Sequence, residues 1–339
     1  PMASASGPLD EQSEYCVISA WIQMEREARM PASALSGIVF VRRSPAPLPD
    51  TPQDYGAFAP GAELVRAAAT QDPATGAITM AAEESLSTLC GLPRATTDVR
   101  RPMVSWDGSK IAFSARKSAA EGFGVYVIEG TTCALEPTVA ASAVDDDGAS
   151  VPTNGELVHN FDPVFSADGR LVFASTRGNV TNAGVIGYAG PQRTPADPSK
   201  LNSNLYVLED GKIRQLTFLL NQELSPSFMR DGRLIMTTEK RQPDFYQLAS
   251  RRMNLDGGDY HPLFGQRSSI GFNQFTEVVE LADKNLAAIF SAKGAAHGAG
   301  TLALINRSIG IDQGSDDPAD YTQSPSAIGY PNPRFYQRS

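Results

Sequence analysis

The stretch RPMVSWDGSKIAFSAR, residues 101–116, recurs as DPVFSADGRLVFASTR at 162–177 and within LSPSFMRDGRLIMTTEK at 224–240. Each copy has a proline, an Asp-Gly pair starting five residues later, and a basic residue eight positions past the glycine. The copies are 61 and then 63 residues apart, which indicates an internal repeat. The residues concerned are Pro102, Pro163 and Pro226, the pairs Asp107 and Gly108, Asp168 and Gly169, Asp231 and Gly232, and the basic residues Arg116, Arg177 and Lys240.

The Asp-Gly pairs predict hairpin turns, because glycine adopts positive φ and aspartate hydrogen-bonds its own backbone. We expect a short strand beginning at the proline, since proline lacks an N–H and suits the first residue of a strand. A buried strand follows each turn: KIAFSA, LVFAST or LIMTT. Further strands are GVYVIEG in the first copy, NLYVLEDG and IRQLTF in the second, and SRRMNLDGG and DYHPLF in the third. Each copy therefore predicts a meander of four antiparallel strands.

Two weaker copies flank the three strong ones. Residues 276–308 keep the strand pattern but have Asp283 and Lys284 in place of Asp-Gly. Residues 37–82 match the second, third and fourth strands, and their first strand is missing. Residues 321–336 are a candidate to supply that strand from the far end of the chain.

Repeats of four short strands are typical of a β-propeller, in which neighbouring blades cover each other's faces. We predict an all-β chain of about four to five four-stranded antiparallel blades, which further sequence or another chain extends to a six- or seven-bladed ring. Apolar residues recur at helical spacing in residues 9–31 and predict one N-terminal helix. This helix either packs on the outside of the propeller or is the end of a preceding domain. The expected organisation is an N-terminal segment at 1–34, blades at 35–310 and an extended segment at 311–339.

Composition narrows the partners. The chain has 339 residues and a net charge of −9, which disfavours nucleic acid as a partner. No apolar run is long enough to predict a transmembrane segment. Of the three cysteines, Cys90 and Cys133 pair if the protein is exported, and otherwise are small buried residues.

Few residues suggest chemistry. The acidic run VDDDGAS makes Asp145 and Asp147 a candidate calcium site, with a solvated acidic turn as the alternative. His159 precedes a repeat, where it is either a ligand or catalytic group or the donor or acceptor of a structural hydrogen bond. The aspartates of the repeated turns are interpreted as turn residues, because a turn recurs in every blade and an active site does not. We assign no catalytic residue and, calcium apart, no cofactor.

The repeats resemble those of TolB, of the PD40 and WD40-like kind, and those of the propellers attached to prolyl-oligopeptidase-type peptidases. The resemblance covers about 100–310. The runs DVRRPMVSWDGSKIAFSARK (98–117) and RQLTFLLNQELSPSFMRDGRLIMTTEKR (214–241) are most similar to the propeller of hydrazine-synthase alpha-subunit-like proteins. That resemblance implies a bacterial, periplasmic or secreted protein beside c-type haem domains. This chain has no C-x-x-C-H motif, so the haem is not carried over.

Two functions remain open. The first is a non-catalytic TolB-like propeller that acts as a binding or scaffold module for other protein chains or domains of an exported bacterial assembly. The second is the propeller portion of an enzyme, a periplasmic c-haem redox complex or a hydrolase, whose catalytic domain lies outside this chain. Histidines and carboxylates converging on the propeller axis favour the enzyme, and an axis lined by turn backbone and apolar side chains favours the scaffold.

Overall fold

The structure, a computed structural model, describes residues 35–44, 56–72, 77–136, 157–177, 202–219, 221–242, 245–264, 274–281, 284–291, 300–305 and 335–338. The predicted helix at 9–31 and the candidate calcium residues Asp145 and Asp147 lie outside them. The chain divides into two compact units, Val39–Val65 with Ser85–Ser339 and Pro1–Ile38 with Arg66–Glu84.

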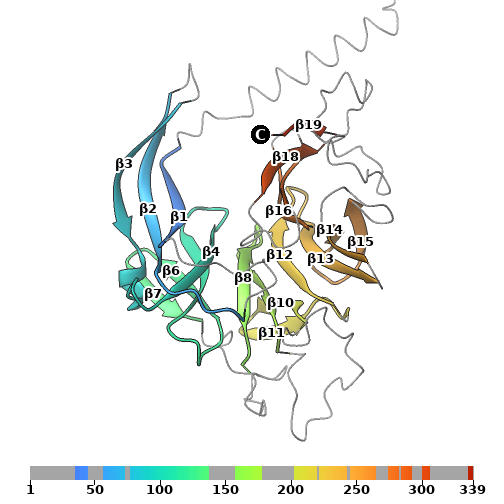
Figure 1. The fold of residues 1–339 in the computed structure, drawn as a ribbon, viewed down its shortest axis with the longest axis horizontal. Coiled ribbons are helices and arrows are strands. Elements are labelled where there is room, and N and C mark those ends of the chain that lie inside the picture. Colours follow the sequence, from blue (N-terminus) through green and yellow to red (C-terminus); the bar gives the residue numbers. More distant parts are fainter. Residues whose placement is uncertain are drawn as a thin grey trace, which may run out of the picture. The chain divides into compact units, whose positions relative to one another are not determined.

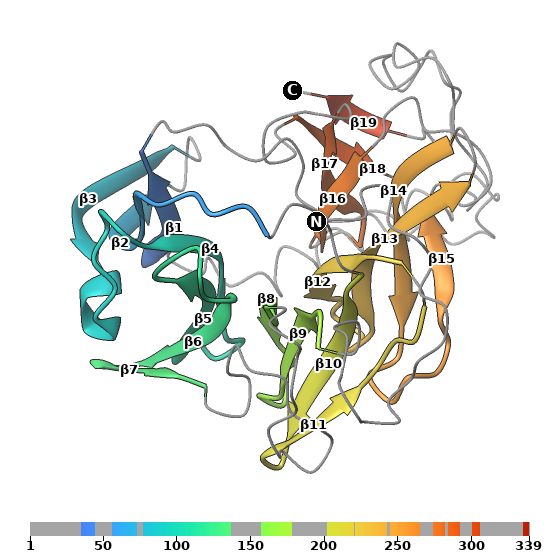
Figure 2. The ribbon, with the colours of Figure 1, turned by 60° about the horizontal axis from the view of Figure 1, so that its bottom comes forward.

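Four antiparallel four-stranded sheets make up most of the larger unit, and in each of them the strands are paired in sequence order (Figures 1 and 2). Blade 1 is β4 (Asp98–Val104), β5 (Lys110–Arg116), β6 (Gly124–Glu129) and β7 (Thr132–Leu135). Blade 2 is β8 (Asn160–Phe165), β9 (Leu171–Ser175), β10 (Asn204–Glu209) and β11 (Lys212–Gln215). Blade 3 is β12 (Glu223–Phe228), β13 (Leu234–Gln242), β14 (Phe245–Met253) and β15 (His261–Phe264). The predicted all-β fold of four-stranded antiparallel propeller blades is confirmed.

Blade 4 is completed by a strand distant in sequence. It contains β16 (Gln274–Glu280), β17 (Leu286–Ser291) and β18 (Thr301–Ile305), and β19 (Phe335–Arg338) pairs with β18 as its fourth strand. From the sequence, the segment at 321–336 is the candidate for the missing first strand of the copy at 37–82. The part of that segment that the structure describes belongs instead to β19 of blade 4.

The fifth sheet has three strands, as the incomplete copy at 37–82 predicted. These are β1 (Gly37–Arg43), β2 (Ala62–Gln71) and β3 (Ile78–Ser85), and a short 3-10 helix, η1 (Ser87–Cys90), follows. Within the smaller unit, Arg66 and Glu84 form an exposed ion pair across the β2–β3 hairpin.

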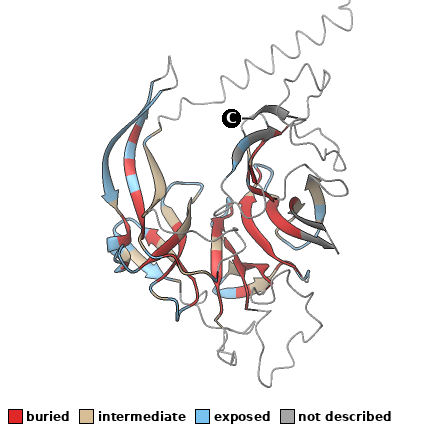
Figure 3. Cartoon of the chain, in the orientation of Figure 1, coloured by how far each residue is buried: buried red, intermediate tan, exposed pale blue. Residues whose placement is uncertain are grey.

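Apolar side chains from successive blades pack into shared cores, and Figure 3 colours much of the blade strands as buried. Phe173 and Tyr206 of blade 2 pack with Val125 of blade 1, and Ile235 of blade 3 packs with Phe290 of blade 4. Burial of a side chain such as Phe173, which has no exposed surface, contributes about 1.5–3 kcal/mol. The strands after each turn are therefore apolar on both faces because a blade lies against each face.

The repeated turns differ in length by one residue. Ser166 N bonds Arg170 O and Met229 N bonds Arg233 O, which leaves three residues in each loop, whereas Ser105 N bonds Lys110 O around a loop of four. A one-residue offset reverses the face to which a side chain points. The equal spacing of the basic residues was therefore misleading: Arg116 faces the opposite way from Arg177.

The prediction that each repeat's first strand begins at its proline is wrong. Pro102, Pro163 and Pro226 lie inside β4, β8 and β12, which start three or four residues earlier. The pairing of each strand with its neighbour shifts at the proline, as it does between Thr276 and Val279 of β16. A β-bulge leaves its extra residue outside the hydrogen-bond ladder, so it accommodates a residue without an N–H.

Candidate functional site

The four bulges place one residue each in an unusual backbone conformation. Arg101, Asp162, Ser225 and Glu277 have φ values of 45°, 51°, 55° and 55°. Positive φ is uncommon outside glycine and costs about 1–2 kcal/mol. These four residues are the bulge cluster. One comes from each of β4, β8, β12 and β16, the edge strands through which neighbouring blades contact each other and which we call the innermost strands.

The side chains of the bulge cluster bind each other. Arg101 Nε lies 2.9 Å from Glu277 Oε2, and Arg101 Nη1 lies 3.5 Å from Asp162 Oδ2. The backbone N–H of Ser225 donates to Asp162 Oδ2 at 2.8 Å, and its hydroxyl donates to Glu277 Oε1 at 3.4 Å. One guanidinium thus joins two carboxylates, and contacts connect all four blades.

Asp162 is the more buried of the two carboxyl groups in the bulge cluster. Its side chain is 13% exposed, against 46% for Glu277. Burial raises the pKa of Asp162, the negative charge of Glu277 adds to that rise, and Arg101 opposes it. Arg101 therefore favours the ionised form of this mostly buried carboxyl.

His159 is a buried hydrogen-bond acceptor at the start of β8. The backbone N–H of Phe123 donates to His159 Nδ1 at 3.4 Å. Burial, followed by the guanidinium groups of Arg116 and Arg100, lowers the pKa of His159 to about 3. The imidazole is neutral at physiological pH, and this contact is a structural hydrogen bond.

A second buried carboxyl lies between blades 2 and 3. Glu223, the first residue of β12, has no exposed surface, and the Tyr260 hydroxyl donates to its Oε1 at 2.6 Å. Asn204 Nδ2 donates to Oε2 at 3.4 Å. Burial raises the pKa of Glu223, and these hydrogen bonds oppose that rise.

The residues singled out in the repeated turns lie at hairpin ends, apart from the bulge cluster. Gly108, Gly169 and Gly232 have positive φ. Asp107 accepts the Ser105 hydroxyl at 2.6 Å, and hydrogen bonds from Ser105 and Ser109 lower its pKa to about 2. Asp168 and Asp231 accept hydrogen bonds from Arg170 and Arg233.

The basic residues of the repeat have different partners. Arg116 donates to the carbonyl oxygens of Gly56 and Glu121. Arg177 donates to Ser175 Oγ and Asn160 Oδ1 within its own blade. The side chain of Lys240 lies outside the described residues.

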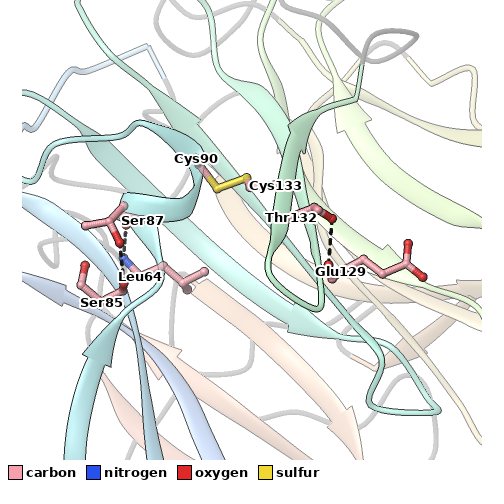
Figure 4. Close-up of a disulfide and its surroundings, with 8 residues drawn as sticks. Leu64, Ser85, Ser87, Cys90, Glu129, Thr132 and Cys133 are labelled. Carbon is pink, nitrogen blue, oxygen red and sulfur yellow. Dashed lines mark hydrogen bonds between the residues drawn. A yellow bond between two sulfur atoms is a disulfide. The ribbon is translucent and has the colours of Figure 1, made fainter.

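Cys90 of η1 and Cys133 of β7 form a disulfide (Figure 4). The sequence left this pairing open. Ser87, in the same short helix, accepts the backbone N–H of Leu64 through its hydroxyl at 2.7 Å. The disulfide therefore ties η1 to the outermost strand of blade 1.

Other kinds of site lack support within the described residues. No group of three or more histidine, cysteine, aspartate or glutamate side chains there could hold a metal ion. No helix there is both long and apolar enough to cross a bilayer. A c-type haem does not fit, since Cys90 and Cys133 are bonded to each other and the sequence has no C-x-x-C-H motif.

Sequence reasoning missed the bulge cluster although a signal was present. In each strong copy the residue just before the repeated proline is polar: Arg101, Asp162 and Ser225. The test proposed from the sequence gives a mixed result among the described residues, because Asp162 and Glu277 converge on Arg101. The described histidines, His159 and His261, are not members of the bulge cluster.

No family model matches the sequence, and no curated protein matches it. Among solved structures, hydrazine synthase from Kuenenia stuttgartiensis is similar with a TM-score of 0.53 and 15% identity, over 90% of this chain and 41% of that chain. TolB from Acinetobacter baumannii has a TM-score of 0.48 and 13% identity, over 91% of this chain and 59% of that chain. The chain thus spans less than two thirds of both, and the likeness to hydrazine synthase supports the β-propeller fold.

Proposed function

We propose that this chain is a non-catalytic propeller module that binds other protein chains or domains within an exported bacterial assembly. The observation that carries the proposal is the mutual pairing inside the bulge cluster. Arg101 occupies the oxygens of Asp162 and Glu277, so the polar groups brought together by the four innermost strands stabilise the blades. A reaction centre instead needs a base or nucleophile that can reach a substrate.

Export is supported by the disulfide. Disulfides persist in oxidising compartments and are rare in the cytosol. The Cys90–Cys133 bond therefore favours a periplasmic or secreted location.

The experiment is native purification of the protein, tagged at its genomic locus, with intact masses of all co-purifying chains and a visible absorption spectrum. A binding module gives a stoichiometric protein partner and no enzymatic turnover that depends on the bulge cluster. Recovery of the protein without a partner from the periplasmic fraction contradicts the proposed binding role. Recovery of the protein from the cytosol contradicts the proposed export.

The similarity to hydrazine synthase favours a second candidate, the propeller portion of a larger redox enzyme. This chain spans 41% of that protein, which leaves room for catalytic domains elsewhere. That candidate expects a haem absorption band in the purified assembly, from a chain or domain other than these residues.

A further inference from the structure

Three arginine side chains hold residues 56–59, which we call the strap, against blade 1. Arg116 Nη2 donates to Gly56 O at 2.7 Å, Arg100 Nη2 to Ala57 O at 2.6 Å, and Arg43 Nη1 to Ala59 O at 2.7 Å. The strap's backbone is therefore bound by side chains, as a peptide ligand is bound, and not by the ladder of a sheet.

The strap is also recognised through a backbone N–H and an aromatic ring. The N–H of Ala59 donates to Asp98 Oδ2 at 3.0 Å. The guanidinium of Arg116 lies 5.1 Å from the centre of the Phe58 ring. Four consecutive residues thus each make a directed contact with the arginines or with Asp98.

Contacts outside the strap fix these arginines. The guanidinium groups of Arg100 and Arg116 lie 4.5 Å and 4.7 Å from the centre of the Phe123 ring. Asp98 binds Arg43 and Arg100, each at 2.8 Å. We call Arg43, Asp98, Arg100, Arg116 and Phe123 the cradle. These contacts within the cradle do not involve the strap, so they do not depend on it.

The cradle is buried and positive. The side chains of Arg43 and Arg100 are 15% and 14% exposed, and Arg116 is 1% exposed. The low pKa of His159 has Arg116 and Arg100 among its causes, which reports the positive potential nearby. Guanidinium groups bind carboxylates more strongly than neutral carbonyls, since both partners are then charged.

We propose that the cradle is a peptide-binding site, that the strap is its displaceable internal occupant, and that the partner is an extended acidic segment carrying an aromatic residue. This rests on the proposed binding function and names its site. Backbone carbonyls and the Phe58 ring show where such a segment would lie, and carboxylates would replace carbonyl oxygens as acceptors. A tethered occupant has an effective concentration in the millimolar range, so it masks the site from weak ligands.

The probe is a fluorescent peptide, Gly-Asp-Phe-Asp, acetylated and amidated so that its side chains carry its charge. The matched peptides are Gly-Ala-Phe-Ala, which copies the strap, and Gly-Lys-Phe-Lys. Phe58→Gly loosens the strap, and we expect it to tighten binding of the acidic probe about fivefold, the factor that corresponds to loss of one cation–π contact. The alanine peptide should bind more weakly than the acidic probe, and the lysine peptide should not bind.

The cradle is tested in the Phe58→Gly background. Arg116→Met should abolish probe binding. Arg43→Met, which changes a partly exposed arginine of the cradle, should weaken probe binding. This variant serves as the test if Arg116→Met does not fold. Arg170→Met removes an arginine from a surface ion pair elsewhere in the larger unit and should leave binding unchanged. Circular dichroism and thermal melting establish that each variant is folded.

Equal binding by the parent and Phe58→Gly, binding insensitive to Arg43→Met, or no binding by either overturns the cradle proposal. These outcomes are separate from those of the native purification. A partner that still co-purifies when the probe does not bind leaves the module proposal standing without this site. Probe binding without any co-purifying partner supports the cradle and contradicts the proposed assembly.

Discussion

Replacing Arg101 by methionine removes the cation from the bulge cluster and leaves Asp162, whose side chain is 13% exposed in the parent chain, beside Glu277. Removing one partner of a buried ion pair costs about 3–5 kcal/mol. Asp162 keeps the Ser225 N–H at 2.8 Å, and the half-exposed Glu277 contributes less than about 1 kcal/mol. We therefore expect Arg101→Met to lower the free energy of unfolding by about 3 kcal/mol at pH 7, measured by urea unfolding.

This loss should depend on pH. The pKa of Asp162 is already raised by burial, and removal of Arg101 raises it further. A carboxyl with a raised pKa binds its proton more tightly in the folded state, so the folded state gains relative stability as pH falls through that pKa. The cost of Arg101→Met should shrink between pH 7 and the ordinary aspartate pKa of 3.8, and Asp162→Asn should recover part of it at pH 7.

Arg170→Met is the matched control, because Arg170 pairs with Asp168 and Glu209, whose side chains are 56% and 35% exposed. It should cost less than about 1 kcal/mol at either pH. A loss from Arg101→Met no larger than this control, or one that is equal at pH 5 and pH 7, refutes the reasoning.

Three further predictions concern single features. Lys284 has a φ of 67° where the other turns have glycine, so Lys284→Gly should raise the free energy of unfolding by about 1 kcal/mol in urea, and a destabilised variant contradicts this. Reduction of the Cys90–Cys133 bond, which spans 43 residues, should lower the free energy of unfolding by about 4 kcal/mol. The denatured chain should have one titratable thiol before reduction and three after it, and three thiols before reduction would contradict the disulfide. Because the pKa of His159 is about 3 when folded and 6.5 when unfolded, stability should fall by up to about 1.4 kcal/mol per pH unit as pH drops below 6.5, and His159→Gln should remove that slope; a nuclear magnetic resonance titration of His159 near pH 6 contradicts it.

The blades could be predicted from the sequence because their determinants are local. An Asp-Gly pair indicates a tight turn. The nearly continuous apolar residues of KIAFSA and LVFAST indicate strands that are buried on both faces by neighbouring blades. The missing first strand of the copy at 37–82 was visible for the same reason. The fourth strand of blade 4 was not, because β19 comes from beyond a long intervening segment and no local pattern names its partner.

The bulge cluster depends on geometry that spacing alone does not reveal. A proline is compatible both with the first position of a strand and with a β-bulge. The first interpretation places Arg101 before β4, whereas the second places it within β4. The first turn likewise contains one extra residue, so Arg116 and Arg177 occupy the same position in the sequence motif but point to opposite faces of their strands. The cradle unites Arg43, Arg100 and Arg116 from separate strands, so it exists only after folding.

The most direct measurement of the central claim, that the bulges of separate blades bring distant residues together, is chemical cross-linking of Arg101→Cys with Glu277→Cys. These positions are 176 residues apart in sequence and share an ion pair in the structure. In a Cys16→Ser background, a short bismaleimide should join the two cysteines within one folded chain, and urea should abolish the reaction; a pair with Lys212→Cys in β11 serves as the control. Cross-linking of the folded chain that is no more efficient than the control pair contradicts the claim.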